Sequence, residues 1–393
     1  MVFFSRIYSI PAIALTFMLL SPPQDAFGFI GGNEYRIGQF CESKSLRRTI
    51  VYIDQALMTE NDVEWARRLR TKLLANLLPS EPVELIRLDP TLGQSKEIWK
   101  RCFPDYKAEQ VKKLESETYI IRENPLKILK KQQEVFESEF LNALTSIYEQ
   151  YKKPKVENTF SFENAPKKNI IRALMSDESR FSHRNLATRV LIYTDALENS
   201  GVFDSFSNSD GVNKGKDAAK KYGINFGQSI FYVYGVGRSL KQPGDAVSTA
   251  KAFWDSFLKS ANGHLNSFGI ELNTSTSKPV NRLVFNFEVS LNRRLAVGLL
   301  SLTHDRDGNL QDSFVSISGQ TGAAIEGTFK CSVSKKCTLE ANTRSDFLTT
   351  YPREKIILEG PPNEMRGHLS VPNAYLESNP EQPAKVKVKA KIK

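Results

Sequence analysis

The chain has 393 residues, of which 40% are hydrophobic, 25% are charged and 10% are aromatic. This composition excludes a largely disordered protein, and the length predicts two domains rather than one. The formal net charge is +10, but five of the lysines lie in the last nine residues. Because the rest of the chain is only mildly basic, no nucleic-acid partner is expected.

The first 28 residues predict export. "MVFFSR" carries one positive charge, a 14-residue apolar run follows it, and the small residues Ala26 and Gly28 come next. This pattern is typical of a cleaved secretory signal peptide over 1–28. The apolar run is shorter than the roughly 20 residues that span a bilayer. We therefore expect a bacterial protein that is periplasmic or secreted.

Four cysteines fit an oxidising compartment. Cys331 and Cys337 flank a short polar stretch within strand-like sequence, which indicates a disulfide across a hairpin. Cys41 precedes the first predicted strand and Cys102 follows the second, so these two can also meet. Four cysteines allow three pairings, so the sequence leaves the connectivity open.

Short apolar strands alternate with helices between residues 45 and 265. Strands are predicted at 48–54, 82–89, 187–197 and 228–238, and helices at 61–77, 167–179, 211–223 and 243–262, with a further short helix ending at Trp99. This alternation indicates a doubly wound, mostly parallel sheet covered on both faces. Residues 106–152 interrupt it with a Glu-, Lys- and Leu-rich segment, which predicts a helical insertion divided at Pro125.

A different pattern follows the polar linker near residue 275. Seven short strands separated by turn signals predict a smaller all-β domain over 282–372, sandwich-like or an open barrel. Residues 377–393, with their alternating lysines, are predicted to be a disordered basic tail. Such a tail is able to contact an anionic membrane surface.

Two acidic segments are weaker candidates for binding. Asp305, Asp307 and Asn309 lie in "THDRDGN", which suggests either a weak calcium loop or, more simply, an Asp-Gly turn between strands. Asp204 and Asp210 follow the strand at 187–197, in a loop at the edge where open α/β sheets carry binding sites. We therefore consider these two a possible partner-binding surface.

Two stretches each place an aspartate at the end of an apolar strand: "TIVYIDQALM" ends its strand at Asp54, and "RVLIYTDALENS" at Asp195. With the order of elements, they resemble the von Willebrand factor type A (vWA) domain family over about 45–265. The resemblance implies a Rossmann-like fold that binds partners at the carboxyl ends of its strands. Many members do so through a divalent cation, held by Asp-x-Ser-x-Ser, a later Thr and a second Asp.

This chain departs from the metal-binding pattern of that family. Ala56 and Met58 stand where the two serines are usual, and Ala196 stands where glycine usually follows the second aspartate. Thr59 and Glu60 are the nearest substitute ligands on the first loop; Ser161 and Asn164 are candidates on the later loop. Together with Asp54 and Asp195, they would form a degenerate metal-ion-dependent adhesion site, with at most weak Mg²⁺ or Ca²⁺ binding.

No catalytic motif is recognisable in the sequence. We therefore expect an exported, non-enzymatic interaction module that binds a protein partner through the top of the sheet, without a strong metal requirement and without a cofactor. Two alternatives remain. One is a metal-dependent hydrolase that uses Asp54 and Asp195. The other is a cell-envelope or secretion-apparatus component whose basic tail touches the membrane.

Overall fold

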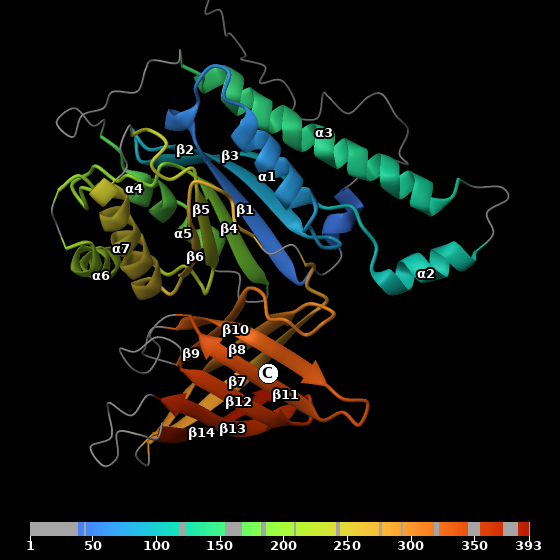
Figure 1. The fold of residues 1–393 in the computed structure, drawn as a ribbon. Helices are drawn as coiled ribbons and strands as arrows, with labels where there is room; N and C mark the ends of the chain where they lie inside the picture. The colour runs from blue at the N-terminus through green and yellow to red at the C-terminus, as the bar shows by residue number, and fades with distance from the viewer. Residues whose placement is uncertain are drawn as a thin grey trace, which may run out of the picture.

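The computed structural model shows an α/β domain stacked on a β-barrel (Figure 1). It describes residues 38–42, 45–117, 123–153, 167–181, 186–207, 210–240, 244–274, 277–291, 294–317, 322–344, 354–371 and 384–392. The predicted signal peptide and the candidate ligands Ser161 and Asn164 lie outside these residues.

The α/β domain is built on a six-stranded sheet with the strand order β3-β2-β1-β4-β5-β6. The strands are β1 (Arg47–Asp54), β2 (Pro82–Asp89), β3 (Gln94–Cys102), β4 (Ala187–Tyr193), β5 (Ile230–Tyr234) and β6 (His264–Gly269). Neighbouring strands are parallel except for the edge strand β3. β1 and β4 are buried along their whole length, because helices cover both faces of the sheet. The doubly wound, mostly parallel sheet is therefore confirmed.

Helices cover the sheet in two layers (Figure 1). They are α1 (Glu64–Leu74), α2 (Ala108–Ser116), α3 (Pro125–Tyr151), α4 (Ile170–Met175), α5 (Glu178–Phe181), α6 (Gly211–Tyr222) and α7 (Gly244–Ser260). One apolar cluster joins α1 and α3 to one face, and a second joins α4 to α7 to the other. The insertion divides at Pro125 as predicted, where Asn124 caps α3 by accepting from the Leu126 backbone N–H. Phe136 and Phe140 of α3 are fully buried, so its apolar stripe packs into the core.

The segment that ends at Trp99 is a strand, and the predicted short helix there is wrong. β3 pairs antiparallel with β2 along its length. Its charged side chains face solvent at the edge, while Trp99 packs edge-on against Phe136 and Phe140, with ring centroids 5.0 and 5.5 Å away. Packing against α3 therefore stabilises a sequence that lacks a clear strand pattern.

The all-β domain is a closed eight-stranded barrel with the order β10-β11-β12-β13-β14-β7-β8-β9. Its strands are β7 (Asn281–Leu291), β8 (Arg294–His304), β9 (Ser313–Ile317), β10 (Ala323–Cys331), β11 (Cys337–Thr343), β12 (Lys355–Gly360), β13 (Glu364–Val371) and β14 (Ala384–Ile392). The seven predicted strands are present. The smaller all-β domain is therefore confirmed. Its sheet closes into a barrel instead of forming two packed sheets, because β9 pairs with β10.

The predicted disorder of residues 377–393 is wrong for 384–392, which form β14. This strand pairs with β13 on one side and β7 on the other. Val388 and Ala390 are buried in the barrel interior. Lys387, Lys389 and Lys391, which alternate with them, lie on the outside. The alternation of lysine with apolar residues is therefore the period of a half-buried strand.

Both disulfides form as the sequence suggested. Cys331 and Cys337 lie opposite each other across the β10–β11 hairpin, with Cα atoms 3.9 Å apart. Cys41 and Cys102 join the 3₁₀ turn at Gly38–Glu42 to the end of β3, with Cα atoms 5.2 Å apart. The second disulfide ties the N-terminal segment to the edge of the sheet.

A buried polar network joins the barrel to the α/β domain. Asp312, just before β9, pairs with Arg47 at 3.3 Å and accepts a 2.7 Å hydrogen bond from the Tyr232 hydroxyl. Arg47 also pairs with Glu81, at 3.0 Å. Because these charges are buried and each has a partner, removing one would leave another uncompensated. The two domains are thus held in a defined orientation.

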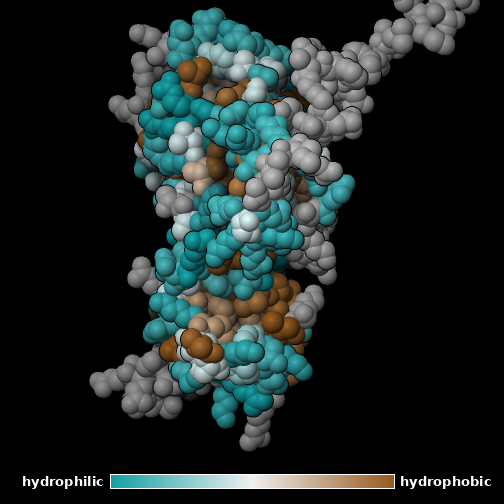
Figure 2. All heavy atoms as spheres, turned by 90° about the vertical axis from the view of Figure 1, so that its right-hand side faces the viewer, coloured by the Kyte–Doolittle hydropathy of each residue, from teal (hydrophilic) through white to brown (hydrophobic). Residues whose placement is uncertain are grey.

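The surface of the barrel carries exposed apolar side chains. Figure 2 shows brown, apolar spheres gathered on the barrel, below a mostly hydrophilic α/β domain. Leu295 and Val297 on the outer face of β8 are among the exposed apolar residues. Of the described helices, none is both long and apolar enough to cross a membrane.

Candidate functional site

The two strand-terminal aspartates meet at the carboxyl edge of the sheet. Asp54 is the last residue of β1, and Asp195 lies two residues beyond the end of its parallel neighbour β4. From these two strands the chain continues toward opposite edges of the sheet, which makes this the topological switch point. Both side chains are buried, with exposures of 0% for Asp54 and 1% for Asp195.

A lysine lies between the two carboxylates. The ammonium Nζ of Lys168 is 2.5 Å from Oδ2 of Asp195 and 3.7 Å from Oδ2 of Asp54. Backbone hydrogen bonds in both directions join Lys168 to Asn199, in the loop after β4, and so position the lysine. The buried negative charges are therefore compensated by a side chain of the same chain.

Every oxygen of the aspartate pair already has a hydrogen-bond donor. Asp54 accepts from the Ala56 backbone N–H at 2.8 Å and from the Thr194 hydroxyl at 2.9 Å. Asp195 accepts from the Leu197 backbone N–H at 3.2 Å and from the Ser239 hydroxyl at 2.6 Å. Because Mg²⁺ needs several free oxygen ligands, this arrangement does not fit a bound divalent cation.

The electrostatics of the site couple the three charged groups. Burial raises the pKa of Asp54, the charge of Lys168 opposes this, and Asp195 adds to it. Burial alone would lower the pKa of Lys168, but the two aspartates outweigh it and raise that pKa above its usual value. The lysine therefore stays protonated at neutral pH and holds the pair together.

A third buried carboxylate, Glu198, lies close to this group. It accepts hydrogen bonds from the backbone N–H groups of Ile170 and Ile171, at 2.8 and 3.3 Å, and from the Ser200 hydroxyl at 2.6 Å. Burial raises its pKa to about 7, although these hydrogen bonds and Lys168 act in the opposite direction. Glu198 thus titrates near neutral pH.

The substitute ligands proposed on the first loop do not join the aspartates. Thr59 forms a parallel backbone bridge with Lys153, and Glu60 is exposed. Neither contributes to the hydrogen bonds of Asp54 or Asp195 described above. Among the described residues, no group of three or more His, Cys, Asp or Glu side chains is arranged to hold a metal ion.

Asp204 and Asp210, the candidate partner-binding residues, have local structural contacts. Asp204 accepts from the Phe206 backbone N–H at 2.9 Å. Asp210 is the N-cap of α6 and accepts from the Asn213 backbone N–H at 3.1 Å. The side chain of Asp210 is nevertheless exposed.

The acidic segment after β8 forms a turn. The carboxylate of Asp305 accepts from the backbone N–H groups of Asp307 and Asn309, at 3.0 and 2.9 Å. It also accepts from the Ser277 hydroxyl, at 2.9 Å. Asp307 and Asn309 are exposed, and the side-chain amide of Asn309 donates to the Asp305 carboxylate at 3.2 Å. The arrangement matches the turn interpretation better than a calcium loop.

Sequence reasoning missed Lys168 and Glu198. Lys168 is one of two adjacent lysines, and nothing in "PKKNII" distinguishes the buried one from the exposed Lys167. It lies only four residues beyond Asn164, on the segment expected to supply the third metal ligand. The signal for Glu198 was present, since it follows Asp195 by three residues in "TDALEN".

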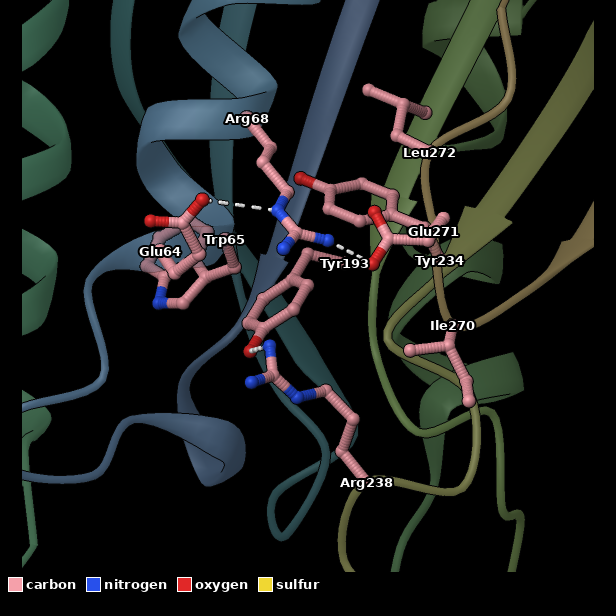
Figure 3. A pocket seen from close by; sticks show the side chains of 9 residues that line it. All are labelled: Glu64, Trp65, Arg68, Tyr193, Tyr234, Arg238, Ile270, Glu271 and Leu272. Carbon is pink, nitrogen blue, oxygen red and sulfur yellow. Dashed lines mark hydrogen bonds and ion pairs between the residues drawn. The ribbon is translucent and has the colours of Figure 1, made fainter.

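A cavity of about 150 Å³ opens at the same edge of the sheet (Figure 3). Its walls come from the first turns of α1, the ends of β4 and β5, and the segment that leaves β6 for the barrel. The lining residues are Glu64, Trp65, Arg68, Tyr193, Tyr234, Arg238, Ile270, Glu271 and Leu272. The carboxyl ends of parallel strands are where open α/β sheets bind ligands.

The cavity has an aromatic floor and two flanking arginines. Trp65 stacks on Tyr193, with centroids 4.5 Å apart, and Tyr193 contacts Tyr234 at 5.2 Å. Arg68 pairs with Glu64 at 3.1 Å and also with Glu271. Arg238, on the other side, donates to the Tyr193 hydroxyl at 3.0 Å and pairs with Asp62 at 3.0 Å.

The Tyr234 hydroxyl is buried and has no hydrogen-bond partner among the described residues. Only 3% of the side chain is exposed, and burial raises its pKa well above the usual value. An unsatisfied buried hydroxyl costs about 1–3 kcal/mol. Figure 3 shows this hydroxyl pointing toward Arg68, across the cavity.

Comparisons with known proteins give only distant likenesses. A scan against protein-family models finds no match, and a search of curated proteins finds none. Several solved structures are similar, among them the following three. The ArnB paralog VWA2 from Sulfolobus acidocaldarius is 8% identical, with a TM-score of 0.31, over 81% of this chain and 65% of that chain. BatB from Bacteroides thetaiotaomicron is 12% identical, with a TM-score of 0.27, over 58% and 91%.

The third similar structure is the human COPII-coat protein Sec24c, which is 10% identical with a TM-score of 0.29, over 88% of this chain and 44% of that chain. The match to the first of these structures, the ArnB paralog, spans slightly less than two thirds of the length of that protein. All three likenesses are too weak to carry a functional argument, which must come from this chain's own residues.

Proposed function

We propose that this chain is an exported, non-enzymatic interaction module with a vWA-like domain, which binds a protein partner at the carboxyl edge of its sheet without a divalent cation. The strand order and the positions of Asp54 and Asp195 at the switch point support this assignment. The C-terminal end of α3 adds a second surface beside this edge, where the Tyr148 hydroxyl accepts from the Asn61 backbone N–H at 2.9 Å.

The observation that carries the proposal is the position of Lys168. Its ammonium lies between Asp54 and Asp195, where a metal would otherwise neutralise the pair. A divalent ion would have to displace a buried lysine from two carboxylates, which leaves that charge uncompensated. The carboxyl edge of the sheet therefore needs no divalent ion to compensate its buried charges. The exposed groups around this edge would then recognise the partner.

The metal-dependent hydrolase alternative has less support. Asp54 and Asp195 are buried, so a substrate in solution does not reach either carboxylate. The Lys168 ammonium also donates to Asp195 at 2.5 Å, so this carboxylate oxygen already has a partner and is not free to act as a general base.

A binding experiment tests the proposal. The full chain, immobilised, is exposed to envelope extract with either EDTA or Mg²⁺. The edge variant Val63→Asp changes an exposed residue just before α1, and Val333→Asp is the control at the exposed β10–β11 turn. We expect one protein to be captured equally under both conditions, lost with Val63→Asp and retained with Val333→Asp. Capture that requires Mg²⁺, or that ignores the edge substitution, would contradict the proposal.

A second candidate, contact with an anionic membrane, is favoured by one observation. Lys387, Lys389 and Lys391 form a row on the outer face of β14. Vesicles with and without anionic lipid test it, using the triple lysine-to-glutamine variant as the comparison. Binding that depends on both anionic lipid and these lysines supports this role, and equal binding of the two chains excludes it.

A further inference from the structure

The wall of the cavity at the carboxyl edge carries an unused hydrogen-bonding group. Tyr234 is the last residue of β5, and its hydroxyl lies in the cavity wall without a partner among the described residues. Most buried polar groups in folded proteins are hydrogen-bonded, so an exception that lines a cavity indicates a missing ligand. A cavity of roughly 10–15 Å³ already holds one water, so the 150 Å³ here accommodates a group of several heavy atoms.

Two arginines determine the charge that this ligand would carry. Arg68 reaches into the cavity from α1, and Arg238 reaches in from the loop after β5 (Figure 3). Their present carboxylate partners are Glu64, Glu271 and Asp62. The side chain of Glu271 is 55% exposed. Exposed ion pairs are weak, so an incoming acid can take its place.

We propose that this cavity binds a carboxylate carried on a small planar, apolar group. The Tyr234 hydroxyl donates to one carboxylate oxygen, and the guanidinium of Arg68 turns from Glu271 to the ligand. The planar fork of arginine matches a carboxylate in two hydrogen bonds. The apolar body of the ligand packs against Trp65 and Leu272, which are buried in the wall.

A carboxylate on a planar, apolar group can come from two sources. One is a free aromatic acid, and the other is the acidic group of a partner's peptide chain. The inference does not depend on the partner proposed above, because free acids test it directly. Phenylacetate and benzoate are therefore titrated into the full chain, followed by ligand-observed NMR and by thermal unfolding. A short peptide ending in phenylalanine, with either a free or an amidated carboxyl end, distinguishes the second source from the first.

Substitutions in and beside the cavity give matched comparisons. We expect Tyr234→Phe to weaken binding of the acid about tenfold without lowering the unfolding temperature, because the hydroxyl has no partner to lose. Arg68→Gln is expected to weaken it about tenfold too. Arg67→Gln is its control, because Arg67 is the next residue on α1 and also pairs with Glu64, but does not line the cavity.

Glu271 distinguishes an acidic ligand from a cationic one. In Glu271→Gln, Arg68 loses its competing partner, so we expect carboxylates to bind several-fold more tightly. A cation held by the aromatic floor and the acids would instead bind more weakly. Three outcomes would overturn the proposal. The chain could bind tetramethylammonium in preference to the acids, or wild type and Tyr234→Phe could bind the acid equally well. Finally, no acid or peptide could reach saturation up to millimolar concentration.

Discussion

Lys168 and Asp195 form a buried ion pair, with Nζ and Oδ2 2.5 Å apart, at the switch point of the sheet. The second carboxylate, Asp54, shares the same ammonium at 3.7 Å. A protein cation thus occupies the position between two strand-terminal acids. The stability of the α/β domain and the electrostatics of the carboxyl edge of its sheet therefore depend on the same side chain.

The first prediction concerns the removal of that cation. Lys168→Met keeps the length of the side chain but leaves Asp54 and Asp195 buried without a counter-charge. Breaking a buried pair in this way costs about 3–5 kcal/mol, so we expect a large fall in the free energy of unfolding, measured with urea. Lys167→Met, at the exposed neighbouring residue, is the control and should change it little. Similar stabilities for the two variants would show that the pair is not important.

The second prediction concerns the pH dependence that Glu198 introduces. Its pKa of about 7 in the folded chain lies above the ordinary glutamate value of 4.5, because burial penalises the charged form. The folded chain therefore binds more protons between these two values, and stability falls as the pH rises from 4.5 to 7. At one pKa unit per 1.36 kcal/mol, the loss contributed by this residue is about 3 kcal/mol.

Glu198→Gln isolates this effect, because glutamine can still accept from the backbone of α4. Relative to wild type, the variant should gain stability as the pH is raised from 5 to 8, as measured by urea unfolding at each pH. Glu178→Gln, at an exposed position that also accepts a backbone N–H, is the control. A difference between wild type and Glu198→Gln that stays constant with pH would contradict the shifted pKa.

The sequence predicted the features that depend on long apolar runs. β1 and β4 each contain a continuous apolar run, IVYI and VLIY, so their place at the centre of a parallel sheet follows from burial on both faces. The Asp54–Asp195 edge follows from the same two strands. Lys168 could not be found in this way, because only the folded loop contacts with Asn199 distinguish it from Lys167. β3 was missed for a similar reason, since its stability comes from Trp99 packing on α3.

The third prediction concerns acid stability at the domain junction. His264, at the start of β6, packs against Phe314 of the barrel with ring centroids 4.4 Å apart. Burial, together with the nearby charge of Lys259, lowers its pKa to about 3 from 6.5. The folded chain binds fewer protons within this range, so stability is lost as the pH falls from 6.5 toward 3. At pH 4.5 the loss amounts to about 3 kcal/mol.

His264→Asn should remove this part of the acid sensitivity. The test compares the free energy of unfolding at pH 7 and pH 4.5 for wild type, His264→Asn and His368→Gln, the last on the outer face of β13. We expect the loss on acidification to shrink only in the His264 variant. The same loss in all three chains would place the acid sensitivity elsewhere.

The last prediction concerns β14, which the sequence led us to regard as a disordered tail. The strand lies between β13 and β7, so the barrel closes only when it is in place. A chain that ends at residue 383 should lose the cooperative unfolding of the barrel and expose two unpaired strand edges, which promote aggregation. Truncation without any change in the unfolding transition would show that the strand is dispensable.

Substitutions at two adjacent positions on β14 test in the full-length chain whether this strand is part of the barrel. Val388 faces the barrel interior and Lys389 faces the outside. Both are replaced by aspartate, so that only the direction of the side chain differs. Val388→Asp buries an unpaired carboxylate and should cost about 3 kcal/mol or more of unfolding free energy. Lys389→Asp keeps the new charge in water and should change stability by less than about 1 kcal/mol. Equal effects would mean that the strand does not alternate between core and solvent. The predicted difference therefore measures directly whether the lysine-rich end of the chain completes the barrel.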